Sequence, residues 1–452
     1  MDNTAPANPA DAAGFTAALR EHLRWQRAEL ARGDVEREPP RFLVLRPGDK
    51  LTVCRPHGDA DLRKQCFRAT PPSTAGPAGV HWDATMLRDQ PAGTSRPVPG
   101  LGNVALSLVA AAAVAIASRR VLLLENFTRP GASFGAPVRE LLAESSGWAP
   151  ALASASRLGA ADGFASHDDF SAFAVLCSAD LRVTPAARVW RVWSNQYFAP
   201  LLLLNPHHAA QVEAMAEALE GSASGDGEDG GGGGGGGGGR RSLWTPGLRA
   251  LWRPSERLRA QLELFRAAKL RERYVGIHVR VSLQEQEKKL DRLGGAVSCL
   301  RARLAANNAS TVFLATMHSA NRRALAQALR PFGHRVVWYG RAVEVQAASR
   351  SATDSALADM ALMGGAAEVL ISAGSTFGYV AQGLSGRRAT LYGGTHTSRE
   401  LVGPRAPDCS AVGTTEAAFH FLPHATRRYT SCREGAVRAK QSALFLSSAV
   451  RH

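Results

Sequence analysis

The chain has 452 residues, of which 45% are hydrophobic and 21% charged, so it is long enough for two domains with buried cores and too apolar for a disordered protein. Its formal net charge of +15 comes from 54 Lys and Arg against 39 Asp and Glu. These cations are scattered among Ala, Gly and Pro and form no basic stripe with interleaved aromatics, so we expect no nucleic-acid partner.

The first 45 residues are predicted to be a disordered leader. They are polar and contain Pro and Ala, with one possible short helix near residues 17–30. Residues 1–40 contain no apolar core of the kind that a signal peptide or membrane anchor requires. The chain as written is therefore expected to be soluble.

An apolar run at residues 106–117 is short for a membrane span and leads directly into Arg119 and Arg120. We therefore expect a buried helix at about 103–118. The β-rich run that begins at Val121 follows it and starts an α/β alternation.

A glycine run divides the chain into two halves. The glycines at 230–239 follow Asp226-Gly-Glu-Asp and cannot bury apolar area, so residues 221–241 are predicted to be a disordered surface insertion. The sequence then predicts an N-terminal Rossmann-like domain at 46–220, a C-terminal one at 242–403, and an extension at 404–452 that packs back on the core.

The second half alternates regularly between strands and helices. Short β-rich runs at 274–279, 311–316, 335–339 and 368–372 are separated by helical segments. This order predicts a parallel sheet with right-handed crossovers, in which a ligand lies outside the carboxyl ends of the strands.

Polar residues follow two of these strands. Arg280 comes directly after the first strand, and Ser375-Thr-Phe-Gly-Tyr follows the last one and opens a helix. A helix N-terminus with two hydroxyls beside an arginine would suit a diphosphate. The alternatives are a surface salt-bridging arginine and a plain helix N-cap.

Six cysteines occur, none in a CxxC pair, which argues against a structural zinc site. Two pairs are close in sequence, Cys54 with Cys66 and Cys409 with Cys432. This arrangement favours short-loop disulfides in an oxidising compartment, and we expect Cys409 to pair with Cys432. Free buried thiols are the alternative.

Two N-glycosylation sequons, Asn126-Phe-Thr and Asn308-Ala-Ser, agree with a secretory location. Such triplets also arise by chance.

No metal site is expected. Asp59-Ala-Asp61 follows a Pro-His-Gly turn, which indicates a solvated loop. His420 and His424 have the spacing of a metal pair, but Pro423 between them argues against one continuous helix.

Several segments resemble, in order, those of the plant xyloglucan and arabinogalactan α-1,2-fucosyltransferase family (galactoside 2-α-L-fucosyltransferases). The longest and most specific runs from Val369-Leu-Ile-Ser-Ala-Gly-Ser-Thr-Phe-Gly-Tyr to Gly386. The others are Gly100-Leu-Gly-Asn with the helix and strand after it, Ser194-Asn-Gln-Tyr-Phe198, Tyr274–Arg280, and a C-terminal element with Thr415-Glu416, Phe419-His420 and Pro423. Together they span roughly 100–432.

The resemblance implies an α/β fold of the GT-B type, with two Rossmann-like domains facing a cleft. It also implies an inverting, metal-independent transferase that moves L-fucose from GDP-fucose to the 2-hydroxyl of galactose on a cell-wall polysaccharide or glycoprotein glycan. Members of the family are Golgi type II membrane proteins. The partners implied are GDP-fucose, a galactose-terminated glycan and the Golgi membrane, the last through a segment missing here.

The resemblance also implies site residues. Arg280 would be the catalytic residue that holds the diphosphate. The donor-binding set would be His278, Arg280, Ser375, Thr376, Phe377, Gly378 and Tyr379. The acceptor side or cleft would be formed by Gly100, Gly102, Asn103, Asn195, Gln196 and Tyr197. We expect substitution of Arg322 or Arg323, on the helix after the second strand, to have little effect.

The sequence departs from the family pattern at four positions. Val104 replaces an arginine, Gly374 a tryptophan, Ala418 a cysteine and His278 a glutamine. These changes keep two alternatives open: a fucosyltransferase with another acceptor or linkage, and a catalytically silent homologue that binds glycans or assembles with a partner.

Overall fold

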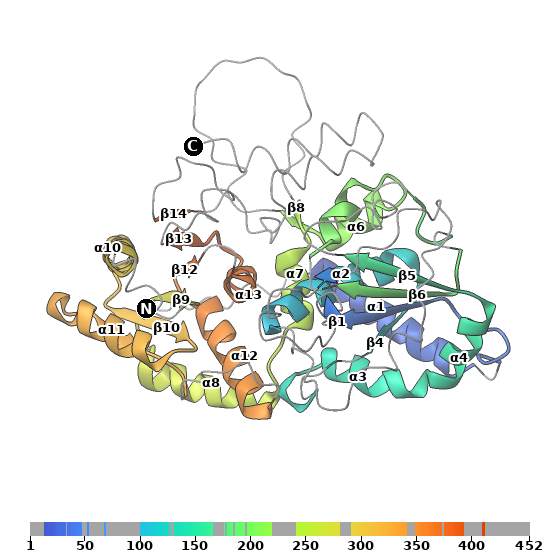
Figure 1. Cartoon of the computed structure of the whole chain (residues 1–452), viewed down its shortest axis with the longest axis horizontal. Helices are drawn as coiled ribbons and strands as arrows, with labels where there is room; N and C mark the ends of the chain where they lie inside the picture. The colour runs from blue at the N-terminus through green and yellow to red at the C-terminus, as the bar shows by residue number, and fades with distance from the viewer. Residues whose placement is uncertain are drawn as a thin grey trace, which may run out of the picture.

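The structure is a computed structural model that describes residues 13–32, 34–47, 52–53, 67–68, 100–125, 127, 131–165, 176, 179–183, 186–194, 197–218, 241–280, 291–340, 349–372, 375–392 and 409–411. This part of the chain is an α/β protein with two separate parallel sheets, one from each half (Figure 1). The α/β class expected from the sequence is confirmed.

The N-terminal sheet has the strand order β4-β1-β6-β5, and every pairing in it is parallel. Its strands are β1 (Phe42–Pro47), β4 (Val121–Leu124), β5 (Ala160–Ala165) and β6 (Val189–Ser194). The helices of this half are α1 (Ala13–Leu30), α2 (Leu101–Ser118), α3 (Val138–Gly147), α4 (Ala149–Leu158) and α6 (Ala209–Met215).

The predicted disordered leader is wrong for the part of it that the structure describes. Helix α1 buries Phe15, Leu19 and Leu23 in the main core, and β1 lies inside the N-terminal sheet from Phe42 onward. The three apolar side chains recur every four residues and so share one face of the helix. That face is hard to see in a segment of mainly polar composition. Residues 1–12 lie outside the described part.

The C-terminal sheet has the order β11-β10-β9-β12-β13-β14, parallel except for β14 at its edge. The strands are β9 (Tyr274–Val279), β10 (Thr311–Thr316), β11 (Arg335–Val337), β12 (Glu368–Ser372), β13 (Thr390–Tyr392) and β14 (Ser410–Ala411). The helices are α8 (Glu256–Lys269), α10 (Asp291–Ala306), α11 (Ser319–Leu329), α12 (Arg350–Gly364) and α13 (Thr376–Ser385). The parallel sheet predicted for this half is confirmed.

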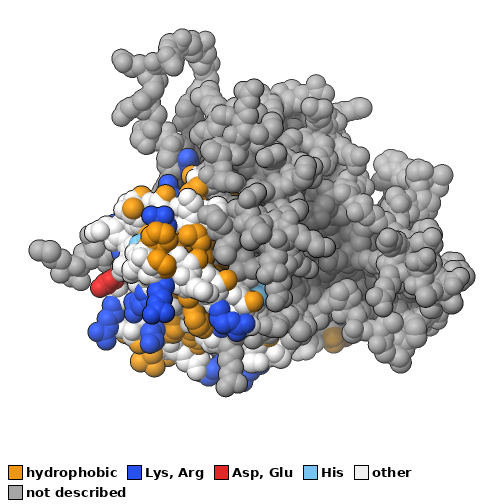
Figure 2. Space-filling view, turned by 60° about the vertical axis from the view of Figure 1, so that its left-hand side comes forward, with side chains coloured by type: hydrophobic (Ala, Val, Ile, Leu, Met, Phe, Trp, Pro, Cys, Tyr) orange, Lys and Arg blue, Asp and Glu red, His pale blue; other side chains and the backbone are white. Residues whose placement is uncertain are grey.

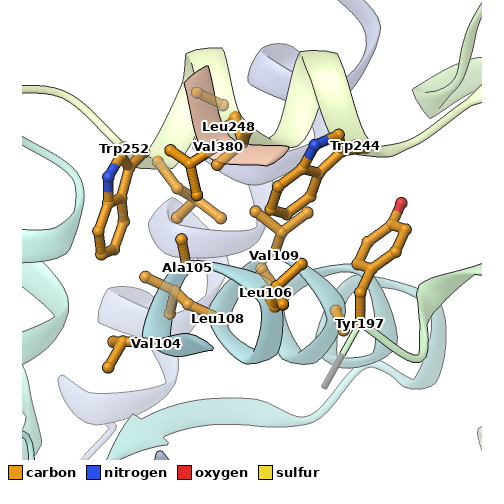
Figure 3. Close-up of a cluster of buried hydrophobic side chains, with 14 of the residues drawn as sticks. Val104, Ala105, Leu106, Leu108, Val109, Tyr197, Trp244, Leu248, Trp252 and Val380 are labelled. Atoms are coloured by element: carbon orange, nitrogen blue, oxygen red, sulfur yellow. The ribbon is translucent and has the colours of Figure 1, made fainter. Parts of the chain in front are cut away.

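Helix α2 lies in the interior, as predicted for the apolar run. It is long and apolar enough to cross a membrane, with a mean hydropathy of 2.0, but 94% of it is buried inside the protein. Figure 3 shows its side chains packed against Trp244 and Leu248 of α7 (Trp244–Leu251) and against Val380 of α13. Because α13 follows a strand of the C-terminal sheet, one core runs through both halves.

The glycine-rich run lies outside the described residues, but its two flanks do not. Strand β7 (Glu217–Ala218) pairs antiparallel with β8 (Arg241–Ser242). The two ends of the intervening segment are therefore neighbours in space. Its deletion should require little movement of the flanking chain.

The disulfide in the described part joins Cys299 of α10 to Cys409, with their Cα atoms 5.3 Å apart. The expected pairing of Cys409 with Cys432 is therefore wrong. Cys299 is buried among the residues that pack under the sheet, and Cys409 reaches it because its backbone N–H binds the carbonyl of Leu391 in β13. Closeness in sequence favoured the wrong partner, whereas the tertiary fold brings together residues 110 positions apart. Cys54, Cys66 and Cys432 lie outside the described residues.

Candidate functional site

The carboxyl end of β9 carries Arg280. All six residues of β9 are buried, and the strand lies between β10 and β12 in the sheet. Arg280 is the next residue, and it is exposed. A cationic residue thus lies at the carboxyl edge of the sheet, the edge at which ligands bind in folds of this kind.

Ser375 lies at the neighbouring strand end. The pairing of β12 with β9 places Ile371 opposite His278, so that the segments after the two strands are adjacent. Ser375 is the N-cap of α13, and its Oγ accepts a hydrogen bond from the backbone N–H of Gly378 at 3.4 Å. The parallel order of β9 and β12 therefore brings the predicted arginine and the predicted helix N-terminus to one edge.

The His278 side chain is buried and packs against the residues that begin α13. Its Nδ1 lies 3.2 Å from Ser375 Oγ, and its ring stacks on Phe377 with centroids 4.5 Å apart. Burial and the neighbouring Arg280 lower the pKa of the His278 imidazole to about 3. The ring is therefore neutral near pH 7. His278 thus contacts two residues of the predicted donor loop, Ser375 and Phe377, from a buried position.

Helix α2 begins directly against this turn. A Cβ atom added to Gly102 would lie 2.6 Å from the carbonyl carbon of Thr376 and 2.7 Å from the backbone nitrogen of Phe377, closer than real Cβ contacts come. A Cβ at Gly100 would meet nothing within 4 Å. Only glycine at position 102 lets the two helix N-termini approach this closely. The Gly100-Leu-Gly-Asn segment is thereby placed beside the predicted donor loop, and Asn103 is half-buried there.

Two tyrosines of the predicted site lie in the core instead. Tyr197 and Tyr379 are 0% and 1% exposed. The Tyr197 ring contacts Trp244 with centroids 4.9 Å apart (Figure 3), and Trp244 donates its indole N–H to the carbonyl of Tyr379. These contacts hold α13 against α7. Neither phenol therefore offers a surface to a ligand, contrary to expectation, while Asn195 and Gln196 lie outside the described residues.

Two buried ionisable side chains that influence each other electrostatically were missed by the sequence reasoning. Arg322 of α11 and Asp359 of α12 are 6% and 8% exposed. Arg322 donates to the carbonyl of Gly340, beyond the end of β11, and its guanidinium lies 5.5 Å from the Trp338 ring. This buried position argues against the prediction that substitution of Arg322 has little effect. Arg323, the next residue, is exposed.

The Asp359 carboxyl is incompletely satisfied. Within the described residues, its Oδ1 and the Nε of Arg322 are buried without a hydrogen-bond partner. Burial raises the pKa of the Asp359 carboxyl well above its usual range, against the opposing effect of Arg322. Buried polar atoms are normally paired, so this unpaired acceptor is a candidate partner for a ligand donor. An aspartate within the apolar run Leu357-Ala-Asp-Met360 was the sequence signal.

No group of three or more His, Cys, Asp or Glu residues able to hold a metal ion occurs in the described part of the chain. Asp59, Asp61, His420 and His424 lie outside it. The site described above comprises one exposed arginine, a helix N-terminus, and the buried side chains of Arg322 and Asp359.

Residues 261–428 match a protein-family model described as xyloglucan fucosyltransferase. The match contains Arg280, the Arg322–Asp359 pair and the N-terminus of α13. It confirms the resemblance to this family over the C-terminal part of the chain. No curated protein sequence matches the chain at a significant level.

Among solved structures, the chain is similar to an arginine-to-lysine variant of Arabidopsis thaliana FUT1 in complex with GDP. The TM-score is 0.55 at 14% identity, covering 89% of this chain and 83% of FUT1. NodZ α-1,6-fucosyltransferase soaked with GDP-fucose gives a TM-score of 0.39 at 15% identity, covering 69% of this chain and 96% of NodZ. POFUT1 in complex with GDP gives 0.37 at 12% identity, covering 76% and 94%. The likeness to FUT1, together with the two parallel sheets, confirms the GT-B type of fold.

Proposed function

We propose that this chain is a fucosyltransferase that uses GDP-fucose as its donor and binds the donor diphosphate between Arg280 and the N-terminus of α13. The observation that carries the proposal is the meeting of these two features at one sheet edge, within the region that matches the xyloglucan fucosyltransferase family. A helix N-terminus presents backbone N–H donors and the positive end of its dipole to an anion.

The role proposed for Arg280 follows from where negative charge develops during fucosyl transfer. Fucosyl transfer breaks the bond between the anomeric carbon and the β-phosphate oxygen, and negative charge accumulates on the departing diphosphate. A guanidinium is always cationic and offers two parallel donors to phosphate oxygens, so Arg280 would bind this charge more strongly as it grows. Because residue 102 is glycine, the N-terminus of α2 packs directly on the Thr376–Phe377 peptide beside this site.

The buried pair supports guanine as the base. Guanine presents donors on N1 and on its exocyclic N2, whereas adenine offers no such pair of donors. The orphan Oδ1 of Asp359 is an acceptor held in place at the same sheet edge, with Arg322 as the balancing charge. Hydrogen bonds from the base would favour the ionised carboxylate and satisfy it.

The acceptor is proposed from family resemblance. We infer transfer to the 2-hydroxyl of a terminal galactose, on a cell-wall polysaccharide or a glycoprotein glycan, in the Golgi. The disulfide between Cys299 and Cys409 agrees with this oxidising compartment. The division into two domains is part of the same proposal, with the C-terminal domain at 242–403 and the N-terminal one extended upstream of residue 46 to include α1 and β1.

A single assay tests the proposal. Purified protein is incubated with GDP-fucose and a galactose-terminated xyloglucan oligosaccharide, and GDP release and product linkage are measured. We expect fucose on the 2-hydroxyl of galactose. Absence of both GDP binding and GDP release would contradict the donor assignment.

One observation favours a second candidate, a silent homologue that binds GDP without turnover. Val104 replaces the arginine of the family pattern, and its side chain is 2% exposed within the core. No cation can act from that position. Binding of GDP with no turnover for any galactoside acceptor would support this alternative.

A further inference from the structure

The sequon Asn308-Ala309-Ser310 forms the turn between α10 and β10, away from the site described above. Asn308 has a φ of 47°, in the left-handed region. Its N–H binds the carbonyl of Ala305, and the N–H of Ala309 binds that of Leu304. This is the Schellman motif that ends many helices, with asparagine in the position that glycine usually takes. The motif explains the backbone of Asn308 and makes no use of its side chain.

The Asn308 side chain is exposed, and its amide makes no hydrogen bond to another described residue. The neighbouring Asn307 differs, because its amide donates to the carbonyl of Arg303 at 2.8 Å and to Glu368 Oε2 at 2.6 Å. The third sequon residue, Ser310, is exposed as well. The acceptor amide and the hydroxyl of the triplet therefore both lie at the surface of the folded protein.

Asn308 also lines a surface groove of about 900 Å³. Phe332, at the end of η7 (Arg330–Phe332), forms part of its wall and is 45% exposed, while Arg301 covers the ring at 3.7 Å from its centroid. Glu272 and His334 add polar groups. Figure 2 turns this end of the molecule toward the viewer, and its described surface carries mainly hydrophobic and basic side chains. An exposed aromatic ring among polar groups is the kind of surface on which a sugar ring packs.

The groove lies at the opposite edge of the sheet from Arg280. Thr311, directly after the sequon, pairs with Tyr274 at the start of β9, and Thr316 pairs with Val279 at its end. Six residues of extended chain separate the two edges, or roughly 20 Å at about 3.3 Å per residue. A bulky group on Asn308 would leave the donor edge open.

We propose that Asn308 is an N-glycosylation site and that the innermost sugars of its glycan occupy this groove against Phe332. In the reaction, Nδ2 of Asn308 forms a bond to the anomeric carbon of a lipid-linked oligosaccharide diphosphate. The bond between that carbon and the diphosphate oxygen breaks, the lipid diphosphate leaves, and the amide loses one proton. This inference goes beyond the proposed function and requires only that the chain pass through the endoplasmic reticulum.

The direct test is peptide mapping of the full chain secreted from a eukaryotic host behind a cleavable signal peptide. We expect the peptide with Asn308 to carry a glycan that peptide N-glycosidase removes. Asn308→Gly and Ser310→Ala should both abolish it, and Ser310→Thr, the matched control, should retain it. Glycine tolerates the left-handed backbone, so Asn308→Gly separates loss of the glycan from loss of the turn. Recovery of the wild-type peptide wholly unmodified would overturn the proposal. GDP-fucose turnover of the same sample reports separately on the proposed function.

A second experiment tests the proposed contact between the glycan and Phe332 in the groove. Enzymatic deglycosylation should lower the melting temperature of the wild type by roughly 1–2 °C, because one modest contact shifts the melting temperature less in a long chain than in a short one. In Phe332→Ser the same treatment should have a smaller effect, because the ring that the sugar covers is missing. Arg330→Ser, at an exposed position of η7 that does not line the groove, is the matched control. Equal shifts in wild type and Phe332→Ser would show that the glycan does not use the groove.

Discussion

Gln26, beside the N-terminal sheet, and Asp359, on a helix of the C-terminal half, are both buried polar side chains, but only Gln26 has partners for both ends of its polar group. Beside the N-terminal sheet, Gln26 of α1 is fully buried, and its amide both accepts from the N–H of Leu122 and donates to the carbonyl of the same residue. Beside the C-terminal sheet, Asp359 is buried with one oxygen unpaired. A polar group whose partners are all supplied by the protein stabilises the fold, whereas an unpaired one at the carboxyl ends of strands is available to a ligand.

The largest effect is expected at Arg280. Arg280→Ala should lower the rate of fucose transfer by a hundredfold or more, because loss of one well-placed donor to developing charge costs about 2.7–4 kcal/mol. Arg280→Lys keeps the charge but loses the two parallel donors, so GDP binding should survive better than turnover. Steady-state kinetics and calorimetric GDP titration measure the two effects. Arg323→Ala, at an exposed position of α11, is the control. A fully active Arg280→Ala would place the donor elsewhere.

The next effect tests the comparison of Asp359 with Gln26 directly. Asp359→Asn should weaken GDP binding by about 10- to 100-fold, since a hydrogen bond to a charged group is worth about 1.5–3 kcal/mol. Gln26→Leu should lower the melting temperature and leave the GDP affinity unchanged. Calorimetry and thermal unfolding on both variants separate the two roles.

Proton release on GDP binding gives a second test of the role of Asp359. The pKa of the Asp359 carboxyl is raised in the empty protein, and donors from the base would lower it, so GDP binding should release a proton. The wild-type affinity should then rise with pH, and this rise should be lost in Asp359→Asn. A pH-independent wild-type affinity would argue against a role for this carboxyl.

A substitution at Gly102 tests whether the close contact between α2 and α13 is needed for stability and GDP binding. Gly102→Ala introduces a Cβ within 2.7 Å of the Thr376–Phe377 backbone, and such overpacking should destabilise the fold by about 1–3 kcal/mol and disturb GDP binding. Gly100→Ala is the matched control, because its Cβ meets nothing within 4 Å. Both variants are compared by thermal unfolding and GDP titration. Equal behaviour of the two would mean that the α2–α13 contact is not needed.

A smaller effect is expected from the pH response of His278. The pKa of His278 is about 3 in the folded protein and about 6.5 in the unfolded chain. The unfolded chain therefore binds more protons between these values, and stability should fall as the pH drops from about 6.5 towards 3. In His278→Gln, the free energy of unfolding should depend less steeply on pH in this window, because one fewer proton is taken up on unfolding. Denaturant unfolding at a series of pH values measures the slope, and an unchanged slope would show that His278 is protonated in the folded state.

No effect is expected from shortening the glycine-rich segment. Deletion of residues 225–239 removes almost no apolar surface, and the pairing of β7 with β8 already holds the two ends together. Loop-closure entropy changes slowly with length, by about 0.6 kcal/mol per doubling. The melting temperature and the GDP affinity should both match the wild type. A drop of several degrees would show that the segment packs on the core.

The sequence by itself determined the local features of this protein. Alternating β-rich and helical runs predicted the parallel C-terminal sheet, and the uninterrupted apolar run predicted α2. Arg280 and Ser375 could be assigned to one sheet edge because the carboxyl ends of parallel strands share an edge. These inferences depend on neighbours within a few residues of each other.

Only the tertiary structure decided which distant residues meet. The approach of Gly102 to Thr376, the pairing of Cys299 with Cys409, and the electrostatic influence of Arg322 on buried Asp359 all connect segments that no local pattern relates. The same holds for Tyr197 and for α1, whose side chains are buried by helices distant in the sequence. Such contacts are set by which faces pack together in the shared core. The periodicity of a single segment shows that a face is apolar, but it does not show what covers that face.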